Sequence, residues 1–127
     1  MINITISGRI PSKKNSKIIV CRGKHPILLS SPAYNTWHEE QMWYLKGLRC
    51  PRGIEKCKVN ITFYSPDKRA SDLSNKVESL NDLLVDSGIL KDDNWFVISE
   101  LHLIFGGVDK DNPRAEIKLY EESMQKL

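Results

Sequence analysis

Acidic residues are missing from the first 38 positions of this 127-residue chain, although Asp and Glu together number 16. The same segment carries six positive charges, on Arg9, Lys13, Lys14, Lys17, Arg22 and Lys24. A segment of one charge sign is typical of surfaces that bind nucleic-acid phosphates, because the bound cations release counterions. A basic loop that serves only solubility is the plainer alternative. We expect DNA contacts from the turn after the first strand, through Lys13, Lys14, Asn15 and Lys17.

The chain also has little cysteine, with only Cys21, Cys50 and Cys57. Their number is odd and no two of them have C-x-x-C spacing, which argues against a disulfide framework and against a zinc site. The three histidines are scattered without a paired spacing. Reduced thiols are the expectation, with pairing of Cys50 and Cys57 on oxidation as the alternative.

No long apolar run is present, and residues 1–7 alternate in polarity instead of forming the basic end and apolar block of a signal peptide. A hydrophobic fraction of 40% and a charged fraction of 28% are ordinary for a globular protein in water. No repeat, low-complexity tract or linker interrupts the chain. We therefore expect a single domain over residues 1–127 in the cytoplasm.

Hydrophobic periodicity predicts several strands and two helices. Alternation predicts strands at residues 1–7, 59–64, 97–105 and 115–119, the third of them buried on both faces, and a hairpin at 18–29 whose tip carries Arg22 and Lys24. Ser31 and Pro32 mark the start of a helix that runs to about Lys46. Turns are expected at Gly106-Gly107 and at residues 109–113. Helices among strands without regular alternation predict an α+β domain, with a mixed sheet of about four to six strands packed against two helices.

Three aromatic side chains lie on the first predicted helix, Tyr34, Trp37 and Trp43. Aromatic side chains stack on unpaired bases in proteins that bind single strands. A stripe of this kind is more often part of a core or of a dimer interface, and that is the interpretation we favour.

The stretch from residue 67 to residue 93 has the densest cluster of acids in a chain whose formal net charge is +3. Leu73, Val77, Leu80 and Leu84 recur at helical steps, with Leu83 beside them, so one face of this helix is expected to meet a sheet. Ser71 or Asp72 is placed to cap the helix with a side-chain oxygen, and Gly88 follows its end. Six carboxylates occur from Asp72 to Asp93. A solvated helix face explains such a stripe, but Asp93 lies beyond the helix end, and a segment packing back would bring it beside Asp72. Two carboxylates with waters are enough for a hard cation such as Mg²⁺.

The stretch contains a Pro-Asp-Lys-Arg loop at 66–69, an Asp72-Leu73-x-Asn75 motif, a helix ending at Gly88, and the pair Asp92-Asp93. In these features it resembles the RusA-type Holliday junction resolvases, which are small metal-dependent DNA endonucleases. The resemblance is close over residues 63–100. The flanks match by pattern only, in the Pro-Ser-x-x-Asn turn at 11–15 and the Ser-x-x-Tyr start of the first helix.

The resemblance implies which side chains hold the metal, Mg²⁺ or Mn²⁺. The family motif usually reads Asp-Leu-Asp-Asn, with both aspartates and the second aspartate of the later pair binding the ion, so Asp72 and Asp93 are the implied ligands. Two positions depart from the pattern. Ser74 replaces the second aspartate, and Glu78 stands where the best-known members often have a catalytic lysine. Because Glu78 lies one turn after Ser74, we hypothesise that Glu78 restores the missing carboxylate.

The remaining roles are hypotheses for this chain. Ser74 and Asn75 are further candidate metal ligands, while Lys76 or Lys68 takes over the phosphate-facing role and Arg69 contacts DNA. The resemblance itself implies the activity, which is resolution of four-way DNA junctions by a homodimer that nicks opposing strands. A catalytically weakened junction-binding dimer is the main alternative, because of Ser74. A nuclease that uses Asp67 with Glu116-x-Lys118 is a weaker one.

Overall fold

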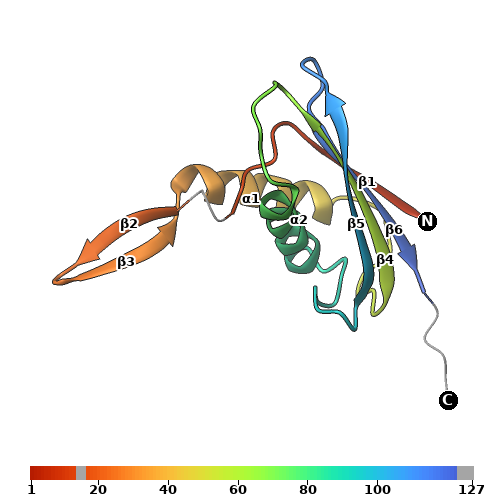
Figure 1. Cartoon of the computed structure of the whole chain (residues 1–127). Helices are drawn as coiled ribbons and strands as arrows, with labels where there is room; N and C mark the ends of the chain where they lie inside the picture. The colour runs from red at the N-terminus through yellow and green to blue at the C-terminus, as the bar shows by residue number, and fades with distance from the viewer. Residues whose placement is uncertain (14–16, 123–127) are drawn as a thin grey trace.

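The computed structural model describes residues 1–13 and 17–122. This part of the chain forms six strands and two helices, in the order β1 (Ile2–Ser7), β2 (Lys17–Arg22), β3 (His25–Ser30), α1 (Pro32–Lys46), β4 (Cys57–Ser65), α2 (Leu73–Asp86), β5 (Ile98–Val108) and β6 (Arg114–Glu121). Figure 1 shows both helices on the same face of the larger sheet. None of the described helices combines the length and the apolar character needed to cross a bilayer.

The larger sheet has four strands in the order β1-β6-β4-β5. Strand β6 runs antiparallel to both β1 and β4, whereas β4 and β5 are parallel. A parallel pair needs a crossover connection, and α2 provides it here. The sheet is therefore mixed and packs against two helices, which confirms the predicted α+β class.

The core lies between this sheet and the helices. Strand β4 alternates in burial, with Val59, Ile61 and Phe63 facing inward. Helix α2 turns Leu80 and Leu84 toward the same core, where both are fully buried. Full burial of a leucine side chain stabilises the fold by about 1.5–3 kcal/mol, more than the ~1 kcal/mol of a typical helix cap. The apolar face therefore fixes α2 in place, as its periodicity predicts.

Helix α1 begins as the sequence predicts. The Ser31 hydroxyl accepts a hydrogen bond from the Tyr34 backbone N–H at 3.1 Å, and Pro32 occupies the first turn. The aromatic stripe divides in two. The Tyr34 ring is buried with its centroid 5.8 Å from that of Trp37, whereas Trp43 is exposed. Tyr34 and Trp37 thus confirm the core interpretation, whereas the exposed Trp43 leaves the dimer-interface interpretation as a prediction.

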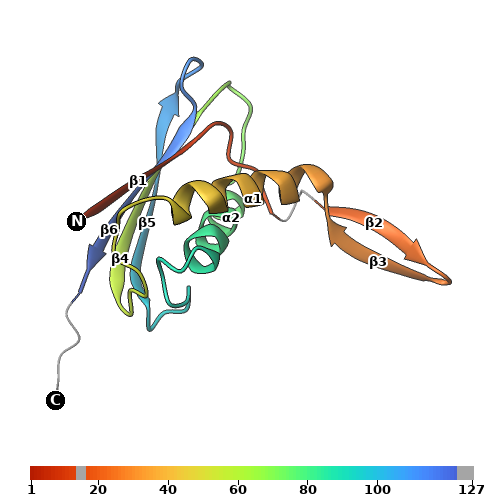
Figure 2. The same ribbon diagram turned by 180° about the vertical axis from the view of Figure 1, so that it is seen from behind.

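Strands β2 and β3 form the predicted hairpin. Arg22 pairs with His25, so Gly23 and Lys24 make its tip, and Gly23 has φ +64°. Figures 1 and 2 show the hairpin projecting away from the rest of the molecule.

Strand β5 differs from the prediction in two ways. It was expected to be buried on both faces, but it is one of the two edge strands of the four-stranded sheet and most of its residues are exposed. Gly106 and Gly107 were expected in a turn, but both lie inside the strand. A β-carbon at Gly106 would lie 2.7 Å from the Tyr64 ring, so close packing against β4, not a turn, accounts for the first glycine. The turn predicted at residues 109–113 is present between β5 and β6.

Candidate functional site

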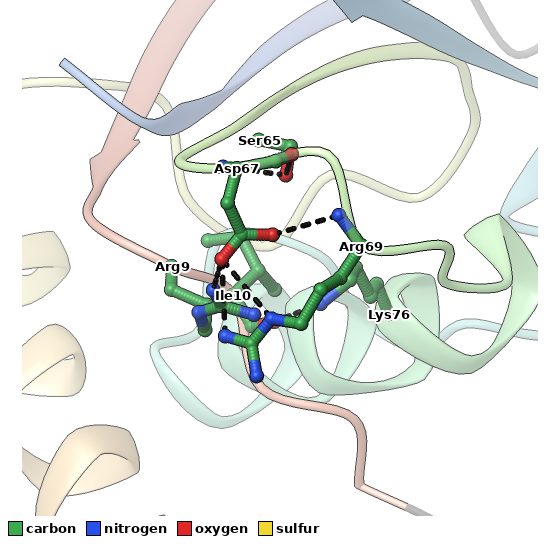
Figure 3. A network of polar contacts seen from close by, with 6 residues as sticks. All are labelled: Arg9, Ile10, Ser65, Asp67, Arg69 and Lys76. Atoms are coloured by element: carbon green, nitrogen blue, oxygen red, sulfur yellow. Dashed lines mark hydrogen bonds and ion pairs between the residues drawn. The ribbon is translucent and has the colours of Figure 1, made fainter. Parts of the chain in front are cut away.

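The loop between β4 and α2 is organised around the carboxylate of Asp67. The Arg69 backbone N–H donates to it at 3.0 Å, and the Arg69 guanidinium donates through Nε at 3.1 Å and Nη2 at 3.0 Å. Arg9, which follows β1, donates to the same carboxylate from the other side. Figure 3 shows the two guanidinium groups converging on Asp67. One acidic side chain thus joins two segments that are 58 positions apart.

The electrostatics of Asp67 follow from these contacts. Hydrogen bonds from Arg69, and then from Arg9, lower the pKa of the Asp67 carboxyl to about 2. The carboxylate is therefore charged at every physiological pH. Both arginines nevertheless keep much of their side chains in contact with solvent, 45% for Arg9 and 74% for Arg69.

Lys76 on the first turn of α2 brings a third cation to this place. Its amine donates a hydrogen bond to the Ile10 carbonyl at 2.6 Å, and the hydroxyl of the buried Ser79 donates to the Pro11 carbonyl at 2.6 Å. These two bonds fasten the segment after β1 to α2. Burial lowers the pKa of the Lys76 amine, and the nearby Arg9 lowers it further.

These cations border a pocket of about 190 Å³. It opens between the end of β1, the β4–α2 loop, the start of α2 and the sheet, and its lining residues are Arg9, Ile10, Phe63, Tyr64, Ser65, Pro66, Arg69, Ala70, Ser71, Leu73, Lys76, Phe105 and Arg114. Ser71 and Leu73 flank Asp72 in the sequence, so the pocket adjoins the predicted metal ligand.

Asp72 occupies the N-cap position of α2, as predicted, but the prediction that a side-chain oxygen caps the helix is wrong. Its carboxylate accepts a hydrogen bond at 3.3 Å from the side-chain amide of Asn75 instead of from a backbone N–H. The Asp72 carboxylate and the Asn75 side-chain amide thus lie side by side at the start of α2, with the amide nitrogen toward the carboxylate. Ser74 and Glu78, one turn apart, are both exposed.

Asp93 lies in the segment between α2 and β5, among other acids. Desolvation raises the pKa of its carboxyl, and the neighbouring Asp92 and Asp82 raise it further. Asp82 is also paired with Lys13, so this predicted DNA contact is held to α2 by an ion pair. Asp93 thus combines partial desolvation with two acidic neighbours.

The predicted metal ligands are not gathered into one cluster. Over residues 1–13 and 17–122, no three His, Cys, Asp or Glu side chains meet closely enough to hold an ion. The α2 carboxylate that raises the pKa of Asp93 belongs to Asp82, which is ten positions beyond Asp72, or about 15 Å along a helix axis. Mg²⁺, however, is usually held by one or two carboxylates together with waters and substrate phosphates. The donors fit a divalent cation in their chemistry, and the meeting of Asp72 and Asp93 on one ion stays a prediction.

The other predicted DNA contacts are spread over the molecule. Lys68 is exposed in the β4–α2 loop and Lys17 is exposed at the start of β2. Lys14 and Asn15 lie outside the described residues. The weaker nuclease alternative receives no support from contacts, because Asp67 is bound by two arginines and Glu116 accepts a hydrogen bond from Arg114 at 2.8 Å.

Sequence reasoning did not single out the roles of Arg9 and Phe105. Arg9 was counted in the basic segment, but its pairing with Asp67 depends on a contact between distant positions. Phe105 was read only as part of an alternating strand, and its place at the pocket depends on the parallel pairing of β5 with β4. No local pattern signals either of these contacts.

Comparison with curated proteins finds a distant relative of the chain. The chain is 28% identical over 98 residues to the crossover junction endodeoxyribonuclease RusA of Aquifex aeolicus (strain VF5), a match that spans 76% of this chain and 75% of that protein. No family model matches the chain. The likeness points to the same family that the motif at residues 66–93 resembles, at the level of a distant relative.

Proposed function

We propose that this protein is an endodeoxyribonuclease that requires a divalent cation and resolves four-way DNA junctions. The observation that carries the proposal is the adjacency of two kinds of charge: the pocket bordered by Arg9, Arg69 and Lys76 adjoins the helix start where Asp72 lies. A nuclease needs cations to hold the DNA backbone and carboxylates to hold a metal ion beside the same phosphate. The name of the Aquifex aeolicus relative supplies the substrate class.

The residues of α2 and the following segment divide the catalytic work. Asp72 and Asp93 would hold the ion, with Asn75 and Ser74 as neutral oxygen donors and Glu78 as the carboxylate that replaces the missing aspartate. A bound Mg²⁺ or Mn²⁺ supplies an activated water and neutralises charge that grows on the phosphate. Arg69 and Lys76 keep the strand in place through its phosphates, which fixes position without reading sequence.

A homodimer belongs to the same proposal, because two opposing strands of a junction must be nicked. Strand β5 supports it, since β5 ends the order of the described sheet and exposes Ile104 and Val108. An edge strand with exposed apolar side chains is a natural surface for pairing with another chain. Sedimentation of the purified protein tests this part independently of activity.

Ser74 favours a second candidate, a dimer that binds junctions without cutting them. A serine hydroxyl is a neutral oxygen where the family pattern has a charged one, and hard cations prefer carboxylates. In this case Asp72 and Asp93 would remain without a catalytic role.

Cleavage of a synthetic four-way junction in Mg²⁺, in Mn²⁺ and in chelator separates these functions. Wild type is expected to give paired nicks only with a metal, and both Asp72→Asn and Asp93→Asn should abolish them while junction binding persists. Asp111→Asn, an exposed aspartate in the β5–β6 turn, is the matched control. Binding without nicks in either metal selects the second candidate. Cutting that survives Asp72→Asn but is lost in Glu116→Gln would favour the Asp67–Glu116 arrangement instead.

A further inference from the structure

The cluster around Asp67 holds more positive charge than its own carboxylate balances. Arg9, Arg69 and Lys76 provide three cations at one place, and Asp67 provides one anion. Lys76 is half-buried, and its nearest oxygen partner is a neutral carbonyl. Burying a cation without a counter-charge is costly, so an additional anion at this place would be stabilised.

Apolar side chains also line the same pocket. Phe63 and Phe105 are paired residues on the parallel strands β4 and β5, and both line the pocket with Leu73 and Pro66. Phe63 is buried, but 57% of Phe105 is exposed. An exposed aromatic side chain at the mouth of a pocket offers a stacking surface for a planar group.

A ligand that contacts both the cations and the aromatic side chains of the pocket must combine an anion with a flat apolar ring, and a nucleotide has this combination. We propose that the pocket takes one unstacked nucleotide of a DNA strand, with its phosphate between Arg9 and Arg69 and its base against Phe105. The choice of DNA as the source rests on the proposed function. A free mononucleotide or inorganic phosphate offers part of the same chemistry, and the experiment below separates these sources.

The proposal links the pocket to the recognition of branched DNA. Taking a base out of a duplex costs unstacking and unpairing energy, and the cost is lowest for a base that is already unpaired. Nucleotides beside a crossover are therefore favoured over those inside a duplex arm. Because Ser71 and Leu73 of the pocket flank Asp72, the captured nucleotide also places a neighbouring phosphate at the start of α2.

A double-mutant cycle between protein and DNA tests the contact with the base. The probe is a short oligothymidylate strand, intact or with one abasic nucleotide moved through every position, and affinity is measured by fluorescence anisotropy. Phe105→Ala should weaken binding of the intact strand about tenfold, since base–aromatic stacking commonly has that effect. On the strand whose abasic position falls in the pocket, the same substitution should change nothing.

Two further variants keep the result interpretable. Tyr44→Ala removes a half-exposed aromatic ring on α1, away from the pocket, and should leave both affinities unchanged. Phe105→Leu keeps an apolar side chain without a stacking ring and should behave like Phe105→Ala. Thermal unfolding monitored by circular dichroism shows whether each variant is folded.

The outcomes separate the pocket from the proposed function. Effects of Phe105→Ala that are equal on intact and abasic strands at every position overturn the pocket proposal, even if the wild type cuts junctions. If Phe105→Ala loses its effect when the abasic nucleotide stands at one position, and the wild type does not cleave junctions, the pocket proposal is supported and the proposed nuclease activity is excluded. If thymidine monophosphate or inorganic phosphate binds as tightly as the strand, and binding of the monophosphate depends on Phe105, the ligand is a free nucleotide and the DNA part is wrong.

Discussion

Two charged regions adjoin helix α2 and differ in how their charges are paired. The basic region consists of Arg9, Asp67, Arg69 and Lys76, and the acidic region consists of Asp82, Asp92 and Asp93. At the start of the helix, Arg9 and Arg69 share Asp67, and every one of these side chains has a partner of opposite charge. Farther along, Asp93 has two acids as its electrostatic neighbours, Asp92 and Asp82. The carboxylates also stand toward the helix C-terminus, where the helix dipole disfavours negative charge. The arginines of the basic region are therefore paired in the folded protein, although three cations stand there against one carboxylate, whereas we expect the acidic region to be relieved by a bound cation.

Removing a carboxylate from the acidic region should have the largest effect. We expect Asp93→Asn to reduce metal-dependent cleavage about a thousandfold, because the charge stabilisation a metal ion supplies is worth several kcal/mol. The free energy of unfolding should instead increase in this variant. The pKa of Asp93 is raised in the folded state, so its charged form costs stability as pH rises above its unfolded pKa, and Asn avoids that cost.

Thermal unfolding with and without Mg²⁺ measures the contribution of Asp93 to metal binding, separately from activity. Mg²⁺ should raise the melting temperature of the wild type, as any ligand of the native state does, and should have little effect on Asp93→Asn. Asp111→Asn should respond like the wild type. An equal shift in all three proteins would show that Asp93 takes no part in binding the ion.

A change in the basic region should affect DNA binding instead. Lys76→Met is expected to weaken junction binding about tenfold and to reduce the slope of log affinity against log salt by about one, as loss of one phosphate contact does. Stability should hold, because the buried amine with its lowered pKa already costs stability at neutral pH.

Lys118→Met, on an exposed lysine of β6, is the matched control for Lys76→Met. It should leave the affinity and the salt slope near those of the wild type. An unchanged salt slope in Lys76→Met would mean that the Lys76 amine of the wild type stays bound to the Ile10 carbonyl when DNA binds, and that it serves the fold alone.

The contrast between the two regions also marks what sequence patterns predict and what they miss. Helix α2, the hairpin and the Ser31 cap follow from periodicity and local chemistry, since each is decided within a few residues. The edge position of β5 and the packing of Gly106 on Tyr64 depend on strand order, which periodicity does not contain.

The contacts of the candidate site also divide into those between residues near in sequence, which a motif can suggest, and those between distant residues, which it cannot. Asp72 and Asn75 are three positions apart, and the structure joins them as the motif suggests. Arg9 and Asp67 are 58 positions apart, and their contact appears only when β1 and the β4–α2 loop are packed together. Lys76 was assigned to phosphate from its place in the sequence, yet its amine is held by Ile10, which no spacing rule reports.

Substitutions at Glu78 and Ser74, the two positions that depart from the family pattern, should have an intermediate effect on metal affinity. Glu78→Gln is expected to lower the affinity for Mg²⁺ about tenfold, and adding Ser74→Asp should restore it, because ligand substitutions commonly act on that scale. Both side chains are exposed and one turn apart, so neither change disturbs the core. Calorimetric titration with Mn²⁺ measures both variants, and an unchanged affinity in Glu78→Gln would exclude Glu78 from the site.

The smallest effect should come from the centre of the basic region. Asp67 has a folded pKa of about 2, below its usual 3.8, so its charge stabilises the fold above about pH 4 and this stabilisation is lost as pH falls toward 2. Asp67→Asn should therefore lower the free energy of unfolding at pH 6 and approach the wild type as the pH falls. Urea unfolding across this range measures the difference, and Asp111→Asn provides the matched loss of an exposed charge. Since the variant also leaves Arg9 and Arg69 without their shared anion, it should bind inorganic phosphate more tightly at neutral pH. A weaker phosphate affinity would mean that Asp67 is needed to position the arginines, and that the order of the basic region matters more than its net charge.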